Sequence, residues 1–156
     1  LKRTLLEVRF PREGEKDLNV FNTHLTAFAF GSDIRRLQVN EIENILDETT
    51  AEGTPWVIGG DFNLLPPGQE NEESTAIEAI FEKYKAMPGY EEVKGENREK
   101  WYTHFPNDPQ IDKPDKTIDY YFLSPKINLG NHYVRREDTL QISDHLPLIA
   151  EVRIRS

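Results

Sequence analysis

Alternating apolar and polar positions at the start of the chain predict two neighbouring β-strands. Within Leu1–Phe10, the side chains of Leu6, Val8 and Phe10 fall on one face, because successive side chains of a strand point to opposite sides. A polar turn follows, and Leu18–Leu25 then alternates in the same way. We expect the two segments to form a hairpin, or at least to be neighbours in one sheet.

Two later stretches have helical spacing. The first begins after Ser32 or Asp33, either of which can cap a helix, and should run to about Thr49. Its apolar stripe is formed by Ile34, Leu37, Ile42, Ile45 and Leu46. The second follows Ser74, is stopped by Met87-Pro88-Gly89, and has an apolar face formed by Ile77, Ile80, Phe81 and Tyr84. Both patterns predict amphipathic helices.

Short apolar runs supply the remaining strands. Trp56–Ile58 is typical of a buried strand, and three further candidates are Thr117–Leu123, His132–Arg136 and Pro147–Ile154. The charged stretch Tyr90–Lys100 is expected on the surface, and Trp101–Pro106 is expected to be a short strand or a segment beside the substrate. This mixture of strands and helices predicts an α/β (α+β) domain.

The strand at Trp56–Ile58 leads into Gly59-Gly60-Asp61-Phe62-Asn63. The glycines allow a sharp turn or the close approach of a ligand. If the backbone stays extended, Asp61 and Asn63 share one face while Phe62 points into the core. A carboxylate and an amide would then project together from a strand end, where α/β sheets bind ligands. An Asx-rich turn without chemistry is the alternative.

Two histidines and two further acids are candidates for the same site. His24 ends the second predicted strand, where it is either structural or a donor to a phosphate oxygen. Asp119 lies within an aromatic strand and needs a partner, because an unpaired buried carboxylate is costly. Asp144 and His145 form a pair on a loop before Pro147. His145 is the expected partner of Asp119, which would fix the tautomer of the imidazole and favour its protonated form.

Arg35 and Gln38 lie three residues apart on the first predicted helix and therefore share one surface. Either this surface is solvated, or the two side chains brace the loops of the candidate site.

Composition restricts the function further. The 156 residues suffice for one domain, and 37% hydrophobic and 30% charged residues are typical of a soluble globular protein. No apolar run is long enough to span a bilayer, and the compartment stays open, with the cytoplasm as the default expectation. The absence of cysteine excludes thiol catalysis, Cys–zinc sites and disulfides.

Net charge is the composition feature that bears most directly on the substrate. At −9, the chain is a poor match for long duplex nucleic acid. A phosphorylated substrate remains possible, because a divalent cation can supply positive charge locally.

Four short motifs occur in order along the chain: Asn22-Thr23-His24-Leu25, Gly60-Asp61-Phe62-Asn63, Ile118-Asp119-Tyr120-Tyr121 and Ser143-Asp144-His145-Leu146-Pro147. Together they resemble the endonuclease/exonuclease/phosphatase superfamily, also called DNase I-like, over about Leu5 to Ile154. The resemblance implies a four-layer α/β sandwich of two packed sheets covered by helices. This chain would supply about the C-terminal sheet with its helices.

The resemblance also implies metal-dependent cleavage of a phosphate ester with Mg²⁺ or Mn²⁺. By this resemblance, Asp61 would orient or deprotonate the attacking water and serve as a metal ligand, and Asn63 would hold the phosphate and that water. His24 would contact the scissile phosphate, and Asp144 would bind the metal. Asp119 would hold His145, which would stabilise the transition state.

One departure from the family pattern stands out. The family carries an Asn at the end of its first strand and a metal-binding Glu in a Leu-Gln-Glu-like motif, and neither precedes His24 here. We therefore expect residues 1–156 to be an endonuclease/exonuclease/phosphatase domain that lacks its N-terminal part. The missing half, or a second copy, would cover the exposed sheet, and the chain alone would bind metal weakly and have little activity.

The sequence favours a phosphodiesterase or phosphatase, with a metal-dependent nuclease as the alternative. A hypothesis of another class is a non-catalytic binding module on the same fold. A degenerate scaffold has no need of six polar side chains at strand ends, which argues against that module. The six are His24, Asp61, Asn63, Asp119, Asp144 and His145.

Overall fold

The computed structural model describes residues 3–27, 32–69, 75–106, 110–140 and 142–155. Its five-stranded sheet has the order β1-β2-β3-β5-β4, and its two-stranded sheet pairs β6 with β7. The strands are β1 (Leu5–Phe10), β2 (Leu18–His24), β3 (Trp56–Asp61), β4 (Lys85–Met87), β5 (Asp119–Leu123), β6 (Ile127–Val134) and β7 (Leu148–Ile154). The helices are α1 (Ile34–Ala51), α2 (Thr75–Lys83), α3 (Tyr90–Lys94) and the 3₁₀ helix η1 (Arg98–Trp101).

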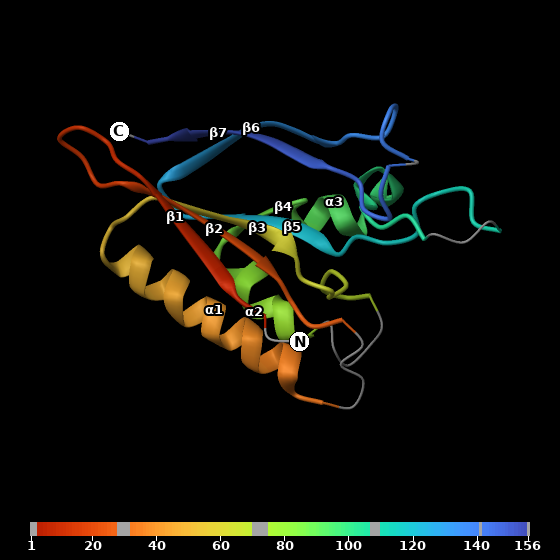
Figure 1. Cartoon of the computed structure of the whole chain (residues 1–156), viewed down its shortest axis with the longest axis horizontal. Helices are drawn as coiled ribbons and strands as arrows, with labels where there is room; N and C mark the ends of the chain where they lie inside the picture. Colours follow the sequence, from red (N-terminus) through yellow and green to blue (C-terminus); the bar gives the residue numbers. More distant parts are fainter. Residues whose placement is uncertain (1–2, 28–31, 70–74, 107–109, 141, 156) are drawn as a thin grey trace.

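Three layers result from these elements. Figure 1 shows α1 and α2 below the five-stranded sheet and the β6–β7 hairpin above it. β1 and β2 are antiparallel neighbours, as the alternating pattern predicts. β2 and β3 are parallel, and α1 makes the crossover that a parallel pair requires. β5 then pairs antiparallel with β3.

The main core lies between the five-stranded sheet and its two helices. The sheet contributes Phe21, Ile58 and Phe122, and the helices contribute Val39, Ile42, Leu46, Ile77 and Ile80, all of them buried. Phe62 and Phe81 each contact Tyr120 and Phe122 edge to face, with ring centroids 5.2–5.9 Å apart. Such aromatic pairs stabilise a core beyond the apolar area that they bury.

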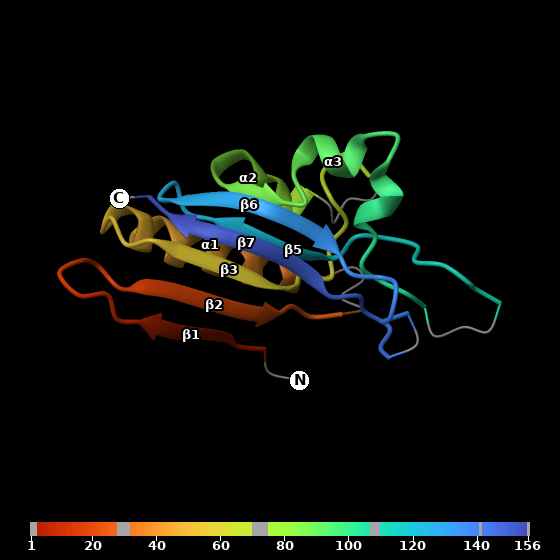
Figure 2. The same ribbon diagram turned by 90° about the horizontal axis from the view of Figure 1, so that it is seen from above.

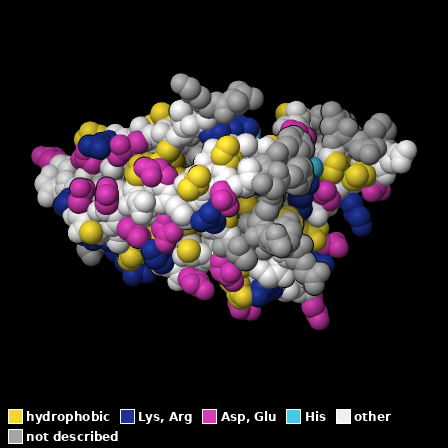
Figure 3. All heavy atoms as spheres, turned by 90° about the horizontal axis from the view of Figure 1, so that it is seen from below, with side chains coloured by type: hydrophobic (Ala, Val, Ile, Leu, Met, Phe, Trp, Pro, Cys, Tyr) yellow, Lys and Arg dark blue, Asp and Glu magenta, His cyan; other side chains and the backbone are white. Residues whose placement is uncertain are grey.

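The outer surface of the helix layer is mostly charged (Figure 3), with Ile34 and Leu37 of α1 also exposed. Acidic and basic side chains intermix there, as Figure 3 shows from below. Lys83 of α2, for example, pairs with Asp47 of α1 at 2.9 Å. This face is therefore an ordinary solvated helix surface.

The opposite face of the sheet is covered only in part. Val57 and Leu123 pack under the hairpin residues Ile127, Leu129 and Ile154, and Figure 2 shows β1 and β2 extending beyond the hairpin. On β1, Leu6, Val8 and Phe10 are 60%, 44% and 51% exposed. The chain thus supplies one sheet with its helices, as expected, and also two strands of a second layer.

Several local predictions need correction. The second helix does not continue to Met87-Pro88-Gly89, because Lys85–Met87 forms the edge strand β4. The stretch Tyr90–Lys100 is not merely solvated surface. It holds α3, whose Val93 is buried, and most of η1. β6 begins five residues before His132. The predicted cap Ser74 lies outside the described residues.

None of the helices in the described part of the chain has the length and apolar character needed to cross a membrane.

Candidate active site

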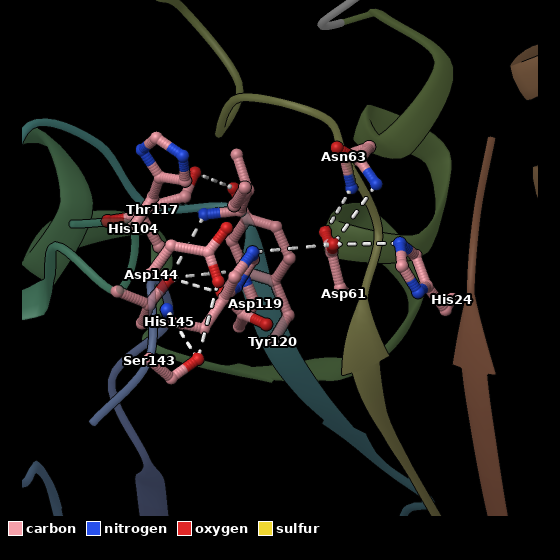
Figure 4. Close-up of polar contacts among 12 residues, drawn as sticks. His24, Asp61, Asn63, His104, Thr117, Asp119, Tyr120, Ser143, Asp144 and His145 are labelled. Atoms are coloured by element: carbon pink, nitrogen blue, oxygen red, sulfur yellow. Dashed lines mark hydrogen bonds and ion pairs between the residues drawn. The ribbon is translucent and has the colours of Figure 1, made fainter. Parts of the chain in front are cut away.

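Three neighbouring strands place His24, Asp61 and Asp119 in one row across the sheet. His24 at the end of β2 lies opposite Asp61 at the end of β3, and Asp61 lies opposite Asp119 at the start of β5. Because β2 and β3 are parallel and β5 is antiparallel, one end of the sheet gathers all three residues. Figure 4 shows their side chains there together with Asn63 and His145.

Gly60 permits this row to form. It has a φ of +152°, and a Cβ at this position would lie 1.9 Å from the carbonyl oxygen of Thr23. Only a residue without a side chain allows β2 to come this close beside Asp61.

Asp61 is the centre of the site. Its Oδ2 lies 3.2 Å from Nε2 of His24 and 3.8 Å from Nε2 of His145. Asn63 donates its backbone N–H to Oδ1 (2.8 Å) and its side-chain amide to Oδ2 (3.0 Å). Asp61 and Asn63 therefore do project together, while Phe62 is buried as predicted.

The backbone reaches that arrangement by a turn, which differs from the extended path assumed from the sequence. Asn63 has a φ of +51°, a left-handed conformation that Asn tolerates better than most residues. The sequence left open an Asx-rich turn or a pair of projecting polar side chains. The structure has both, because Asp61 binds the backbone N–H of Asn63 and the two side chains still project together.

The environment of Asp61 shifts the pKa of its carboxyl upward. Burial raises the pKa of its carboxyl above the ordinary value, the hydrogen bond from the Asn63 backbone opposes this, and the negative charge of Asp119 adds to the rise. The imidazoles of His145 and His24 lower that pKa again by attraction. A carboxylate with a raised pKa is a better proton acceptor for a water molecule.

Asp119 and His145 form the pair that the sequence predicts. Nδ1 of His145 donates to Oδ2 of Asp119 over 2.9 Å. This hydrogen bond raises the pKa of His145, burial opposes the rise, and the charges of Asp119, Asp61 and Asp144 add to it. His145 is therefore disposed to carry positive charge beside Asp61.

Asp144 lies on the same side of the site as Asp119 and His145 (Figure 4). The Ser143 hydroxyl donates to its Oδ1 over 3.3 Å. Within the described residues, no three acidic or histidine side chains form a group that could hold a metal ion by themselves. Mg²⁺ is often bound by only one or two carboxylates together with waters and substrate phosphates. Asp61 and Asp144 therefore stay predicted metal ligands.

Arg35 and Gln38 brace the loops of the site, so the solvated-surface interpretation is wrong. Nη1 of the buried Arg35 donates to the carbonyl of Asn63 over 2.6 Å. Gln38 accepts from the backbone N–H of Thr26 (3.1 Å) and donates to the Thr26 hydroxyl (2.9 Å). The helix α1 thereby fixes the segments that follow both His24 and Asp61.

Thr103 and His104 are site residues that the sequence pattern does not single out. Thr103 donates its hydroxyl to Asp119 over 2.6 Å. His104 binds Asp115 through Nδ1 at 2.7 Å, and its ring lies 5.6 Å from that of His145. The only signal was the interpretation of Trp101–Pro106 as a substrate-side segment. Nothing in the sequence pattern pairs a threonine with an acid 16 positions away.

Comparison with solved structures finds the same fold in three proteins that illustrate the result. An endonuclease/exonuclease/phosphatase from Beutenbergia cavernae matches 99% of this chain with a TM-score of 0.67 and 25% identity. The catalytic domain of human nocturnin, with a bound sulfate anion, matches 97% with a TM-score of 0.68 and 19% identity. An endonuclease/exonuclease/phosphatase from Bacteroides vulgatus matches 98% with a TM-score of 0.68 and 22% identity.

The chain therefore has the α/β fold of endonuclease/exonuclease/phosphatase structures, which confirms the resemblance of its four motifs. It spans 40%, 53% and 56% of the lengths of these three proteins. No protein-family model matches the sequence, and no curated protein matches it.

Proposed function

We propose that the whole protein is a divalent-metal-dependent phosphoesterase, which hydrolyses a phosphodiester or a phosphomonoester, and that this chain supplies the C-terminal part of its site. The observation that supports this most is the Asp61 carboxylate, which lies between the imidazoles of His24 and His145. One of those imidazoles is held in turn by Asp119.

Each of these residues has a role that its surroundings favour. Asp61, with its raised pKa, accepts a proton from the attacking water. Asn63 fixes the rotamer of Asp61 through two hydrogen bonds. His24 and His145 present their Nε2 atoms on either side of Asp61 and stabilise the negative charge that develops on the phosphorus oxygens.

The charge balance of the site is the argument for a metal. Asp61, Asp119 and Asp144 bring three carboxylates to a region with two imidazoles, so an anionic phosphate is repelled unless a cation joins it. Asp61 and Asp144 would hold Mg²⁺ or Mn²⁺, which when bound would neutralise phosphate oxygens. Their number is small for the whole ligand set, which is why we expect this chain alone to bind metal weakly.

The proposed substrate is a phosphate ester other than long duplex nucleic acid. A net charge of −9 opposes a tight grip on long duplex nucleic acid. A small ester, a lipid or sugar phosphate, or a short single strand makes fewer phosphate contacts and is compatible with an acidic surface.

Hydrolysis of bis-(p-nitrophenyl) phosphate and of p-nitrophenyl phosphate by the whole protein, with Mg²⁺, Mn²⁺ or EDTA, tests the proposal. We expect metal-dependent release of nitrophenol that falls about a hundredfold or more in His145→Ala. The preferred substrate separates a diesterase from a monoesterase. His132→Ala is the matched control, because His132 stacks on Trp101 and binds Glu92 instead of a residue of the candidate site.

Absence of hydrolysis with both substrates and both metals, in a folded protein, would favour the non-catalytic binding module. Equal loss of activity in His145→Ala and His132→Ala would instead contradict the role of His145, because both variants would then act through stability.

A further inference from the structure

The short segment Thr103–Phe105 joins the two parts of the chain that carry Asp119 and His145. The backbone N–H groups of its first two residues both donate to the carbonyl of Lys116, over 2.9 and 3.0 Å. On its other side, the backbone N–H of Leu146 donates to the carbonyl of Thr103 over 2.7 Å. The backbone N–H of Phe105 donates to the carbonyl of Asp144, also over 2.7 Å. The segment thus holds the backbone on both sides of His145 and the approach to β5.

The side chain of Thr103 points from this segment to the carboxylate of Asp119. The hydroxyl donates to Oδ2 over 2.6 Å, and the same Oδ2 accepts Nδ1–H of His145. The hydroxyl oxygen also accepts the backbone N–H groups of Ile118 and Asp119, over 3.3 and 3.2 Å. Its donor and acceptor capacity are therefore both used, and its own proton is directed at the carboxylate.

Burial makes this contact persistent. Thr103 is 0% exposed, so no water competes for Oγ1. A short hydrogen bond to an ionised oxygen is among the stronger hydrogen bonds in proteins. Two donors on one oxygen fix the rotation of the Asp119 carboxylate, and the carboxylate in turn fixes the imidazole of His145.

His104 contacts the same imidazole through its ring. Its ring meets the ring of His145 edge to face at 85°, and its Nδ1 is held by Asp115. The imidazole of His145 is therefore in contact with both the Asp119 carboxylate and a histidine ring that Asp115 holds.

We propose that Thr103 is a positioning residue, whose hydroxyl holds the Asp119 carboxylate in the orientation that receives Nδ1–H of His145. Its effect on turnover rests on the proposed function, but the hydrogen-bonded chain itself does not. Groups that orient metal-binding histidines through a hydrogen bond contribute about 10- to 100-fold to activity, and we expect an effect of this size from Thr103.

The test uses this chain with ¹⁵N-labelled histidine, at one pH near neutrality and with EDTA. A carboxylate-bound Nδ1–H gives a downfield, slowly exchanging proton resonance, which His145→Asn identifies by its absence. We expect Thr103→Val, which keeps the shape and removes the hydroxyl, to broaden or shift this resonance upfield. Thr103→Ser keeps the hydroxyl, so the resonance should stay as it is in the unmodified chain.

Thr117→Val is the matched control. Thr117 is also a buried threonine, and its hydroxyl donates to the carbonyl of Trp101 over 2.8 Å instead of to Asp119. An unchanged resonance in a folded Thr103→Val would overturn the proposal. Equal loss in Thr117→Val would do the same, because the effect would then reflect general loosening. Loss in Thr103→Ser would also contradict it.

Kinetics of the whole protein add a second readout. Thr103→Val should lower kcat about 10- to 100-fold with little change in KM, and Thr103→Ser should restore it. If the whole protein has no esterase activity, only the proposed function fails, and the resonance still decides the role of Thr103.

Discussion

Asp61 and Asp119 lie directly opposite one another on the antiparallel strands β3 and β5. Like charges on facing positions of a sheet repel, and the charge of Asp119 raises the pKa of Asp61. His145 contacts both, with Nδ1 2.9 Å from Asp119 and Nε2 3.8 Å from Asp61. The imidazole of His145 therefore reduces the repulsion between the two facing carboxylates, which lowers the stability of the fold. Such a loss of stability is common at functional sites.

Asp61→Asn should stabilise the chain at neutral pH. The folded pKa of Asp61 is raised above its unfolded value, so the folded state binds more protons, and stability falls as pH rises from the unfolded pKa through the folded one. Asp61→Asn has no ionisable carboxyl at this position, so its stability should not fall with pH in this way. Thermal unfolding with EDTA should show equal melting temperatures below pH 4 and a higher one for Asp61→Asn at pH 7. A lower melting temperature at pH 7 would contradict this prediction.

Gly60→Ala should prevent β2 and β3 from pairing. The added methyl group would lie 1.9 Å from the Thr23 carbonyl oxygen, which belongs to the backbone and cannot rotate away. We expect an unfolded or insoluble chain by circular dichroism. Gly14→Ala is the control, since Gly14 also has a positive φ (+71°) but open space around it. It should cost only about 1 kcal/mol of strain.

Sequence patterns predicted the parts of the structure that depend on periodicity and on strand ends. The strand before Gly59 and the helix from Ile34 follow from apolar spacing, and the Asp119–His145 pair follows from the cost of a lone buried acid. β4 was missed because three residues at a sheet edge have no measurable period. The contact of Thr103 with Asp119 was missed because it depends on how distant loops meet, which propensity does not encode.

Arg35→Met should loosen the loop that follows Asp61. The substitution keeps much of the apolar volume of the buried side chain but leaves the Asn63 carbonyl without its guanidinium donor. We expect a loss of about 1–3 kcal/mol in the free energy of unfolding by denaturant titration. Arg36→Met is the neighbouring control: its exposed pair with Asp33 at 3.0 Å should contribute less than about 1 kcal/mol. Equal losses in both variants would show that Arg35 does not brace Asn63 specifically.

The exposed face of β1 should make this chain associate with itself. Leu6, Val8 and Phe10 alternate along the edge strand β1, which the β6–β7 hairpin leaves uncovered (Figure 2). A contiguous apolar strand face favours burial against a partner. Either the remainder of the whole protein or a second copy would cover it. In the chain alone, sedimentation velocity should show a dimer fraction that rises with protein concentration. The double variant Leu6→Lys/Val8→Lys should be a monomer. Leu37→Lys on α1, an equally exposed leucine on the helix layer, should leave the dimer unchanged. A monomer at all concentrations would exclude the second copy, and binding would then be tested with the remainder of the protein supplied as a separate polypeptide.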